Sequence, residues 1–73
     1  MPNQTYAITH VVGTSPDGVD QAIRNGIARA GESLRQLDWF KVTEIRGWMD
    51  HGAEVRDFQV TMELGFRYED DPA

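Results

Sequence analysis

The sequence contains no cysteine, and this absence sets the first limit on what the chain can be. A domain of 73 residues buries only about 60% of the surface that its unfolded chain exposes, so its own core stabilises it weakly. Small domains usually compensate with disulfides, bound metals or partner subunits. Disulfides are excluded, and a structural zinc site is not expected because His10 and His51 are far apart in the sequence. Oligomerisation is the remaining route, and the lack of cysteine fits a reducing cytoplasm.

Basic residues and long apolar runs are also scarce. The net charge is −5 and the isoelectric point is about 4.7, which argues against a protein that binds nucleic acid. No apolar run approaches the length of a membrane span and no secretory signal pattern is present, so we expect no membrane partner and no export. Apolar residues make up 40% of the chain, a composition typical of a globular domain.

The hydropathy pattern predicts four elements in the order β-α-β-β. Residues 5–12 are rich in β-formers and predict a strand, and residues 41–49 and 54–68 predict two more, joined by a turn at 50–52. Apolar residues at helical spacing predict a helix over 16–35, with Ser15 as its N-cap. In the last strand, alternate residues are expected to face one way: Phe58, Val60, Met62, Leu64, Phe66 and Tyr68. The tail after residue 68 is expected to fray.

These elements predict an α+β domain in which one helix packs on a three-stranded antiparallel sheet. A helical crossover prefers to connect parallel strands, and the hairpin makes the last two strands antiparallel, so we expect the third strand to lie between the other two. One helix cannot cover strands of this length, so apolar area and sheet edges are left for other subunits. We therefore expect one domain over residues 1–73, with an ordered core of about residues 5–68.

The chain has no recognisable catalytic centre, so we do not expect an enzyme. Ser15 and Ser33 have no convincing His/Asp partners, and there is no cysteine nucleophile. The segment GTSPDG at 13–18 lacks the spacing of a phosphate-binding loop and is better interpreted as the start of a helix. His10 is more readily a paired or solvated side chain than a phosphate ligand.

Trp39 and Phe40 are the main anomaly, because two adjacent aromatic rings are costly to leave in water. One interpretation makes Trp39 an anchor of the core or of an interface, with Phe40 as the core member of the pair. Another makes Trp39 a stacking platform for an electron-poor planar heterocycle. Gln59 offers amide donors and an acceptor that match the edge of a flavin or nucleobase. Arg46 and Arg67, on strands expected to be neighbours, suit a phosphate, a carboxylate or cross-strand salt bridges.

These residues lie in a series of motifs that resembles the dodecin family: VVGTSPDGVDQAI, ARA, LDWF, EIRG and FQVT…GFR, in this order over residues 6–68. The resemblance implies a β-α-β-β subunit that assembles with copies of itself into a hollow homododecamer. It implies that Trp39, of LDWF, stacks on the isoalloxazine ring at a two-fold interface, so that two flavins lie between two indoles. Gln59, of FQV, would hydrogen-bond the polar edge of the ring. Arg46, of EIRG, and Arg67, of GFR, would lie near the flavin or its phosphate.

The same resemblance implies storage and buffering of a flavin. An indole in contact with an excited flavin can donate an electron and take it back, so fluorescence and photochemistry are quenched. The likeness is to bacterial, especially actinobacterial, members, so we expect FMN, with riboflavin as the alternative. It also implies coenzyme A as a candidate ligand of a second site, to which Arg29 is a conceivable contributor.

Two other functions remain open at this point. An FMN-dependent redox enzyme would need open access to flavin N5 and a substrate pocket. A structural small oligomer without a ligand would use Trp39 and Gln59 only as interface residues. The hairpin GWMDHGAEVRD departs from the family pattern through its bulky Trp48 and Met49, which makes Trp48 a candidate interface residue.

Overall fold

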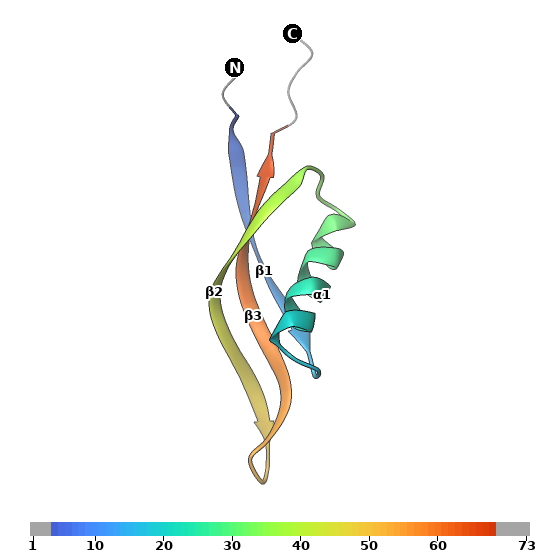
Figure 1. The fold of residues 1–73 in the computed structure, drawn as a ribbon, viewed down its shortest axis with the longest axis vertical. Helices are drawn as coiled ribbons and strands as arrows, with labels where there is room; N and C mark the ends of the chain where they lie inside the picture. Colours follow the sequence, from blue (N-terminus) through green and yellow to red (C-terminus); the bar gives the residue numbers. More distant parts are fainter. Residues whose placement is uncertain (1–3, 69–73) are drawn as a thin grey trace.

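The computed structural model describes residues 4–68. Its elements are β1 (Tyr6–Ser15), α1 (Val19–Gly31), β2 (Leu37–Asp50) and β3 (Glu54–Arg67). The strands form one sheet in the order β1-β3-β2, and β3 is antiparallel to both of its neighbours. Helix α1 therefore connects two parallel strands on either side of β3 (Figure 1). The predicted α+β fold with its central third strand is confirmed.

The helix begins later than predicted, because the segment before it forms a local turn. Ser15 is the last residue of β1 and is buried, and its Oγ accepts a hydrogen bond from the backbone N–H of Asp17 at 3.0 Å. Such side chain to backbone bonds compete with helix formation. Helix α1 accordingly begins at Val19, after Gly18 as its N-cap. The prediction of Ser15 as the helix cap is wrong.

The helix also ends earlier than predicted, and the second strand begins earlier. Helix α1 ends at Gly31, and β2 begins at Leu37, so the LDWF motif lies within the strand. Between them Gln36 adopts a left-handed φ of 65°, which turns the chain from the helix into the sheet. Strand β3 lies within one residue of its prediction. The prediction for residues 69–73 lies outside the described residues.

The core lies between α1 and one side of the sheet. Val60, Met62 and Leu64 alternate along β3 with at most 1% of their surface exposed, as the sequence pattern predicts. Tyr68 falls outside this buried row, with 61% of its surface exposed. Partly buried apolar side chains surround the core: Val11, Val19, Ile23, Ile27, Ala30, Leu37 and Val42.

Two glycines allow α1 to lie directly against β1. A β-carbon on Gly26 would lie 3.1 Å from the Cα of Gly13 and 2.9 Å from the Cε of Met62. A β-carbon on Gly13 would overlap the backbone carbonyl of Ala22. Because the helix and the strand approach so closely here, even the short side chain of Ala22 is completely covered.

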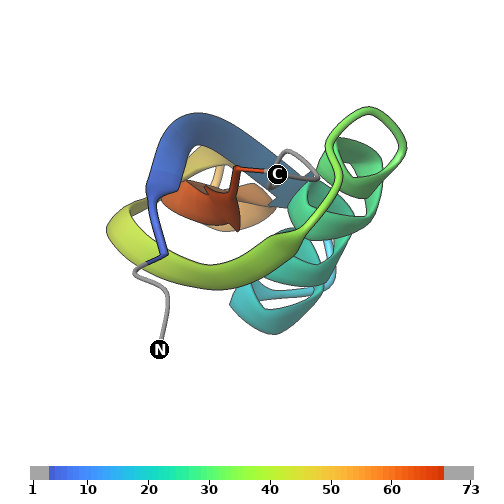
Figure 2. The same cartoon turned by 90° about the horizontal axis from the view of Figure 1, so that it is seen from above.

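The other side of the sheet has no cover within the described chain. A helix of 13 residues is about 20 Å long, whereas strands of 14 residues reach about 46 Å. The β2–β3 hairpin therefore runs on beyond the helix (Figure 1), and α1 lies on one side of the curved sheet (Figure 2). Large apolar side chains remain exposed along the strands, among them Ile8, Val12, Ile45, Trp48, Met49 and Val55. No helix of residues 4–68 has the length and apolar character of a membrane span.

Candidate functional site

The indole of Trp39 lies across Gly65, its neighbour on β3, on the uncovered side of the sheet. A β-carbon on Gly65 would overlap three bonded ring atoms of Trp39, with Cε2 nearest, followed by Cζ2 and Nε1. Cε2 lies between Cζ2 and Nε1 in the ring system. If the edge of the indole faced Gly65, Cζ2 and Nε1 would be nearer to the β-carbon than Cε2, but Cε2 is the nearest atom. The face of the indole therefore lies over the strand. The opposite face points away from the sheet, and the side chain is 38% exposed.

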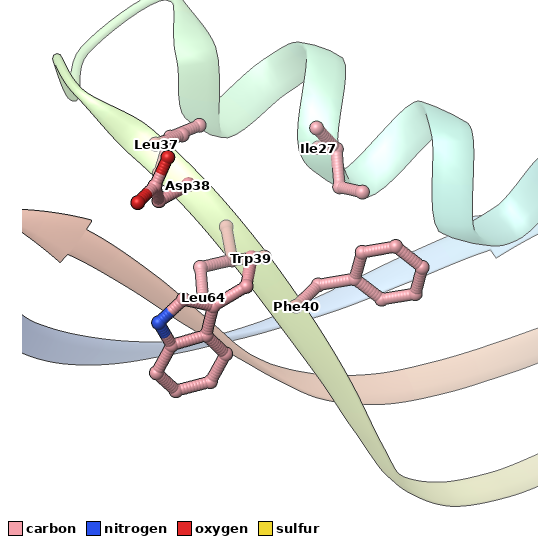
Figure 3. Close-up of a pocket in the computed structure, with 6 residues that line it drawn as sticks. All are labelled: Ile27, Leu37, Asp38, Trp39, Phe40 and Leu64. Atoms are coloured by element: carbon pink, nitrogen blue, oxygen red, sulfur yellow. The ribbon is translucent and has the colours of Figure 1, made fainter.

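Phe40 projects to the other side of the sheet, toward α1 (Figure 3). It is 48% exposed, more than Trp39, so the prediction that Phe40 is the core member of the pair is wrong. A hollow of about 130 Å³ lies here, smaller than the ~300–1,000 Å³ of typical ligand pockets. Its lining residues are Ile27, Leu37, Asp38, Trp39, Phe40 and Leu64. A planar heterocycle therefore fits the exposed indole face better than this hollow.

A β-bulge brings Asp38 close to the Trp39 platform. The pairing with β3 shifts between Leu37 and Trp39, so Asp38 is an extra residue in β2. Because of this extra residue, the Leu37 side chain can point toward the core while the neighbouring side chains of Asp38 and Trp39 both lie on the uncovered side of the sheet. The Oδ2 of Asp38 accepts a hydrogen bond from the hydroxyl of Tyr6 at 3.0 Å and lies 3.9 Å from the Nε of Arg67.

Tyr6 and Arg67 complete the surroundings of the platform. The rings of Tyr6 and Trp39 have centroids 6.4 Å apart and planes tilted by 58°. The hydrogen bond to the Asp38 carboxylate raises the pKa of Tyr6 above its ordinary value, with smaller contributions from desolvation and from the charge of Asp38. Arg67 donates from Nη2 to the Oε1 of Gln36 at 3.1 Å. Sequence reasoning missed Tyr6, Asp38 and Gln36, because partners about 30 positions apart leave no local signal.

Arg46 and Gln59 form a second cluster on the same side of the sheet. They are direct partners in the β2–β3 register, and the Nε of Arg46 donates to the Oε1 of Gln59 at 3.2 Å. This bond orients the amide so that its NH₂ group points away from Arg46, where it can donate to an acceptor on a ligand. Arg46, Gly47 and Trp48 line a hollow of about 190 Å³ beside this pair.

The two clusters lie far apart within one chain. Gly65, under Trp39, and Gln59 are six positions apart on β3, which corresponds to about 20 Å of strand. The strands of Arg46 and Arg67 are neighbours as predicted, but the two arginines lie toward opposite ends of the sheet. One subunit therefore brings Trp39 together with Arg67 and Arg46 together with Gln59, but it does not bring all four residues together.

The middle of this side, between the clusters, carries a contact between a histidine and a glutamate. The Nε2 of His10 lies 3.5 Å from the Oε2 of Glu63, its partner across the β1–β3 ladder. The sequence favoured a paired or solvated side chain for His10, and the imidazole lies beside Glu63 while most of it is exposed. His51 lies at the exposed tip of the β2–β3 hairpin. Among residues 4–68 no group of three or more His, Cys, Asp or Glu side chains could hold a metal ion.

The fold and the site together define a small α+β subunit with an aromatic platform on the uncovered side of its sheet. The Dodecin family model matches residues 5–69. A dodecin of Thermus thermophilus is 46% identical over 67 residues, which cover 92% of this chain and 96% of the relative. The chain belongs to the dodecin family, a family of small flavin-binding proteins.

Solved structures of two actinobacterial dodecins have the same fold. The dodecin from Streptomyces davaonensis is 55% identical with a TM-score of 0.90, and the match covers 94% of this chain and 100% of that chain. The dodecin from Streptomyces coelicolor is 56% identical with a TM-score of 0.89, over 97% of this chain and 100% of that chain. The resemblance to the bacterial, actinobacterial branch of the family is therefore confirmed.

Proposed function

We propose that this protein stores and buffers FMN by stacking it on Trp39 in pairs, and that it quenches the photoreactivity of the flavin without catalytic turnover. The observation that carries the proposal is the position of the indole, with one face held over Gly65 and the other open. A flat, electron-rich ring held in this way suits an electron-poor isoalloxazine. An excited flavin in contact with the indole takes an electron from it and returns the electron before other reactions occur.

The complete site requires more than one copy of the chain. Trp39 and Gln59 are separated by about 20 Å of strand, so a single isoalloxazine cannot reach both within one subunit. A flavin that stacks on Trp39 of one copy can meet Gln59 only where a second copy supplies it. The uncovered side of the sheet and the exposed apolar residues of the hairpin offer surface for such contacts. We propose the homododecamer that the motifs imply, in the cytoplasm, with other copies of the chain as its partners.

Arginines have to hold the FMN phosphate against an unfavourable overall charge. The net charge of −5 per chain repels a phosphate, so local guanidinium groups must outweigh it. Arg67 and Arg46 each lie beside one part of the proposed site. A charge-assisted bond to either guanidinium favours FMN over riboflavin, which has no phosphate.

The test is a titration of the flavin-free protein with FMN, followed by flavin fluorescence. We expect strong quenching that saturates near one flavin per subunit. Trp39→Ala should remove most of the quenching, while Trp48→Phe, which removes the other indole but keeps an aromatic ring on the hairpin, should retain it. A parallel titration with riboflavin measures the contribution of the phosphate. Equal quenching in Trp39→Ala and the unmodified protein, or no quenching in either, would overturn the proposal.

A further inference from the structure

Tyr6 has no role in the proposed flavin contacts, yet it is held beside the platform. Its ring centroid lies 6.4 Å from that of Trp39, within the range of interacting aromatic pairs. Its hydroxyl lies 3.0 Å from the Oδ2 of Asp38. An electron donor next to the indole and a proton acceptor next to that donor are thus assembled from β1 and β2.

We propose that Tyr6 is an electron relay to Trp39: when the indole is oxidised, Tyr6 reduces it and passes its phenolic proton to Asp38. The oxidant is the photoexcited flavin, so the role in the cell rests on the proposed function. The transfer between Tyr6 and Trp39 is a property of this chain alone and can be measured without a flavin.

The relay step balances in electrons and protons. Removal of one electron from the indole leaves a radical cation on Trp39. Tyr6 gives one electron to Trp39 while its O–H bond breaks and the proton moves to the Oδ2 of Asp38. The products are a neutral indole, a phenoxyl radical on Tyr6 and a protonated carboxyl on Asp38. When the electron returns from the reduced oxidant to Tyr6, the proton returns from Asp38 to the phenol oxygen.

The hydrogen bonding makes Asp38 the acceptor of the proton. The Tyr6 hydroxyl also lies 3.0 Å from the Oε1 of Gln4, but an amide oxygen is a far weaker base than a carboxylate. Hydrogen bonds to a charged acceptor are also the stronger ones. The bond raises the pKa of Tyr6, so the phenol keeps its proton until the electron leaves. Electron and proton then depart together, which makes the phenol a better reductant than it is without a base.

The experiment isolates the transfer from flavin binding. The flavin-free Trp48→Phe protein, in which Trp39 is the sole tryptophan, is photoionised by a laser pulse at the red edge of the indole absorption band. Nitrous oxide removes the ejected electrons, and excess tert-butanol removes the hydroxyl radicals that nitrous oxide forms from them. Transient absorption then follows the indole radical and the phenoxyl radical. We expect the indole signal to decay as the phenoxyl signal grows, at a rate independent of protein concentration and slower in D₂O.

Variants identify the donor and the acceptor. Tyr6→Phe should lose the growth of the phenoxyl signal, and the matched Tyr68→Phe variant should retain it. Asp38→Asn should also lose it, because an amide cannot take the proton. Growth that persists in Tyr6→Phe, or no growth in the Trp48→Phe protein, would overturn the relay, and unchanged growth in Asp38→Asn would overturn the role of Asp38. The comparison of H₂O and D₂O needs no further variant and tests the proton step even where a variant fails to fold.

Discussion

Trp39 and Gly65 form one unit of the structure: the indole occupies the space that any side chain at position 65 would fill. The pairing is across the β2–β3 ladder, between residues distant in the sequence. Gly65 is buried because the indole covers it. The orientation of the platform therefore depends on the absence of a side chain on the neighbouring strand, and this dependence can be tested directly.

Gly65→Ala should displace the indole and weaken flavin quenching. A β-carbon here overlaps the ring, and forced overpacking of this kind typically costs about 1–3 kcal/mol. Urea unfolding measures the free energy of unfolding, and FMN titration measures the loss of quenching. Gly31→Ala is the matched control, since its β-carbon would meet only the Cδ1 of Leu37, at 3.9 Å. Unchanged stability and quenching in Gly65→Ala would show that the strand does not position the indole.

Arg46→Gln and Arg67→Gln should show which arginine gives the protein its higher affinity for FMN than for riboflavin. A hydrogen bond to a charged group contributes about 1.5–3 kcal/mol, so the arginine that meets the phosphate should strengthen FMN binding by about 10- to 100-fold. The affinity for riboflavin should change little in that variant. Arg24→Gln is the control, because Arg24 pairs with Asp20 at 3.0 Å on the exposed side of α1. If both variants bind the two flavins with the same relative affinity as the unmodified protein, neither arginine contacts the phosphate.

Tyr6 should ionise above the ordinary tyrosine pKa of 10.0, because its hydroxyl donates to the carboxylate of Asp38. Because the pKa of Tyr6 is higher in the folded state than in the unfolded state, the hydrogen bond contributes its full stability at pH values below the unfolded pKa. This contribution is lost as the pH rises through the folded pKa. Tyrosinate absorbance in a Tyr68→Phe background, where Tyr6 is the sole tyrosine, measures the pKa. Asp38→Asn should lower it toward 10.0. An equal pKa with and without the Asp38 carboxylate would contradict this hydrogen bond.

Ala53→Gly should stabilise the β2–β3 hairpin. Ala53 has a φ of 68°, and a non-glycine residue in such a conformation carries strain of about 1–3 kcal/mol. Glycine removes the strain but makes the unfolded chain more flexible, at a cost of about 0.4–1 kcal/mol. The central values of these two terms leave a net gain of about 1 kcal/mol, which urea unfolding measures. Ala28→Gly, on the exposed side of α1, should instead cost about 1 kcal/mol, and a loss of stability in Ala53→Gly would contradict the account.

The errors of the sequence interpretation have local causes. Ser15 followed by Pro16 is typical of a helix start. In the structure Ser15 instead accepts a hydrogen bond within a turn at the end of β1, and the helix begins only at Val19. The LDWF segment lacks regular alternation, because the bulge at Asp38 shifts the pattern by one residue. A bulge of this kind leaves no mark in a single sequence. Besides the adjacent aromatic residues, Gly65 was a further signal for the platform, since a glycine inside a strand often marks a close approach.

The sequence by itself determined the order of the elements, the central place of β3 and the buried row of Val60, Met62 and Leu64. These features follow from backbone periods that repeat over a few residues and from the rules that connect neighbouring elements. Only the tertiary structure decided that Trp39 lies face-on over Gly65, that Tyr6 meets Asp38, and that the four candidate residues fall into two clusters. Those relationships depend on the register between strands distant in the chain, and this register is set by bulges and close packing that the pattern within one strand does not show.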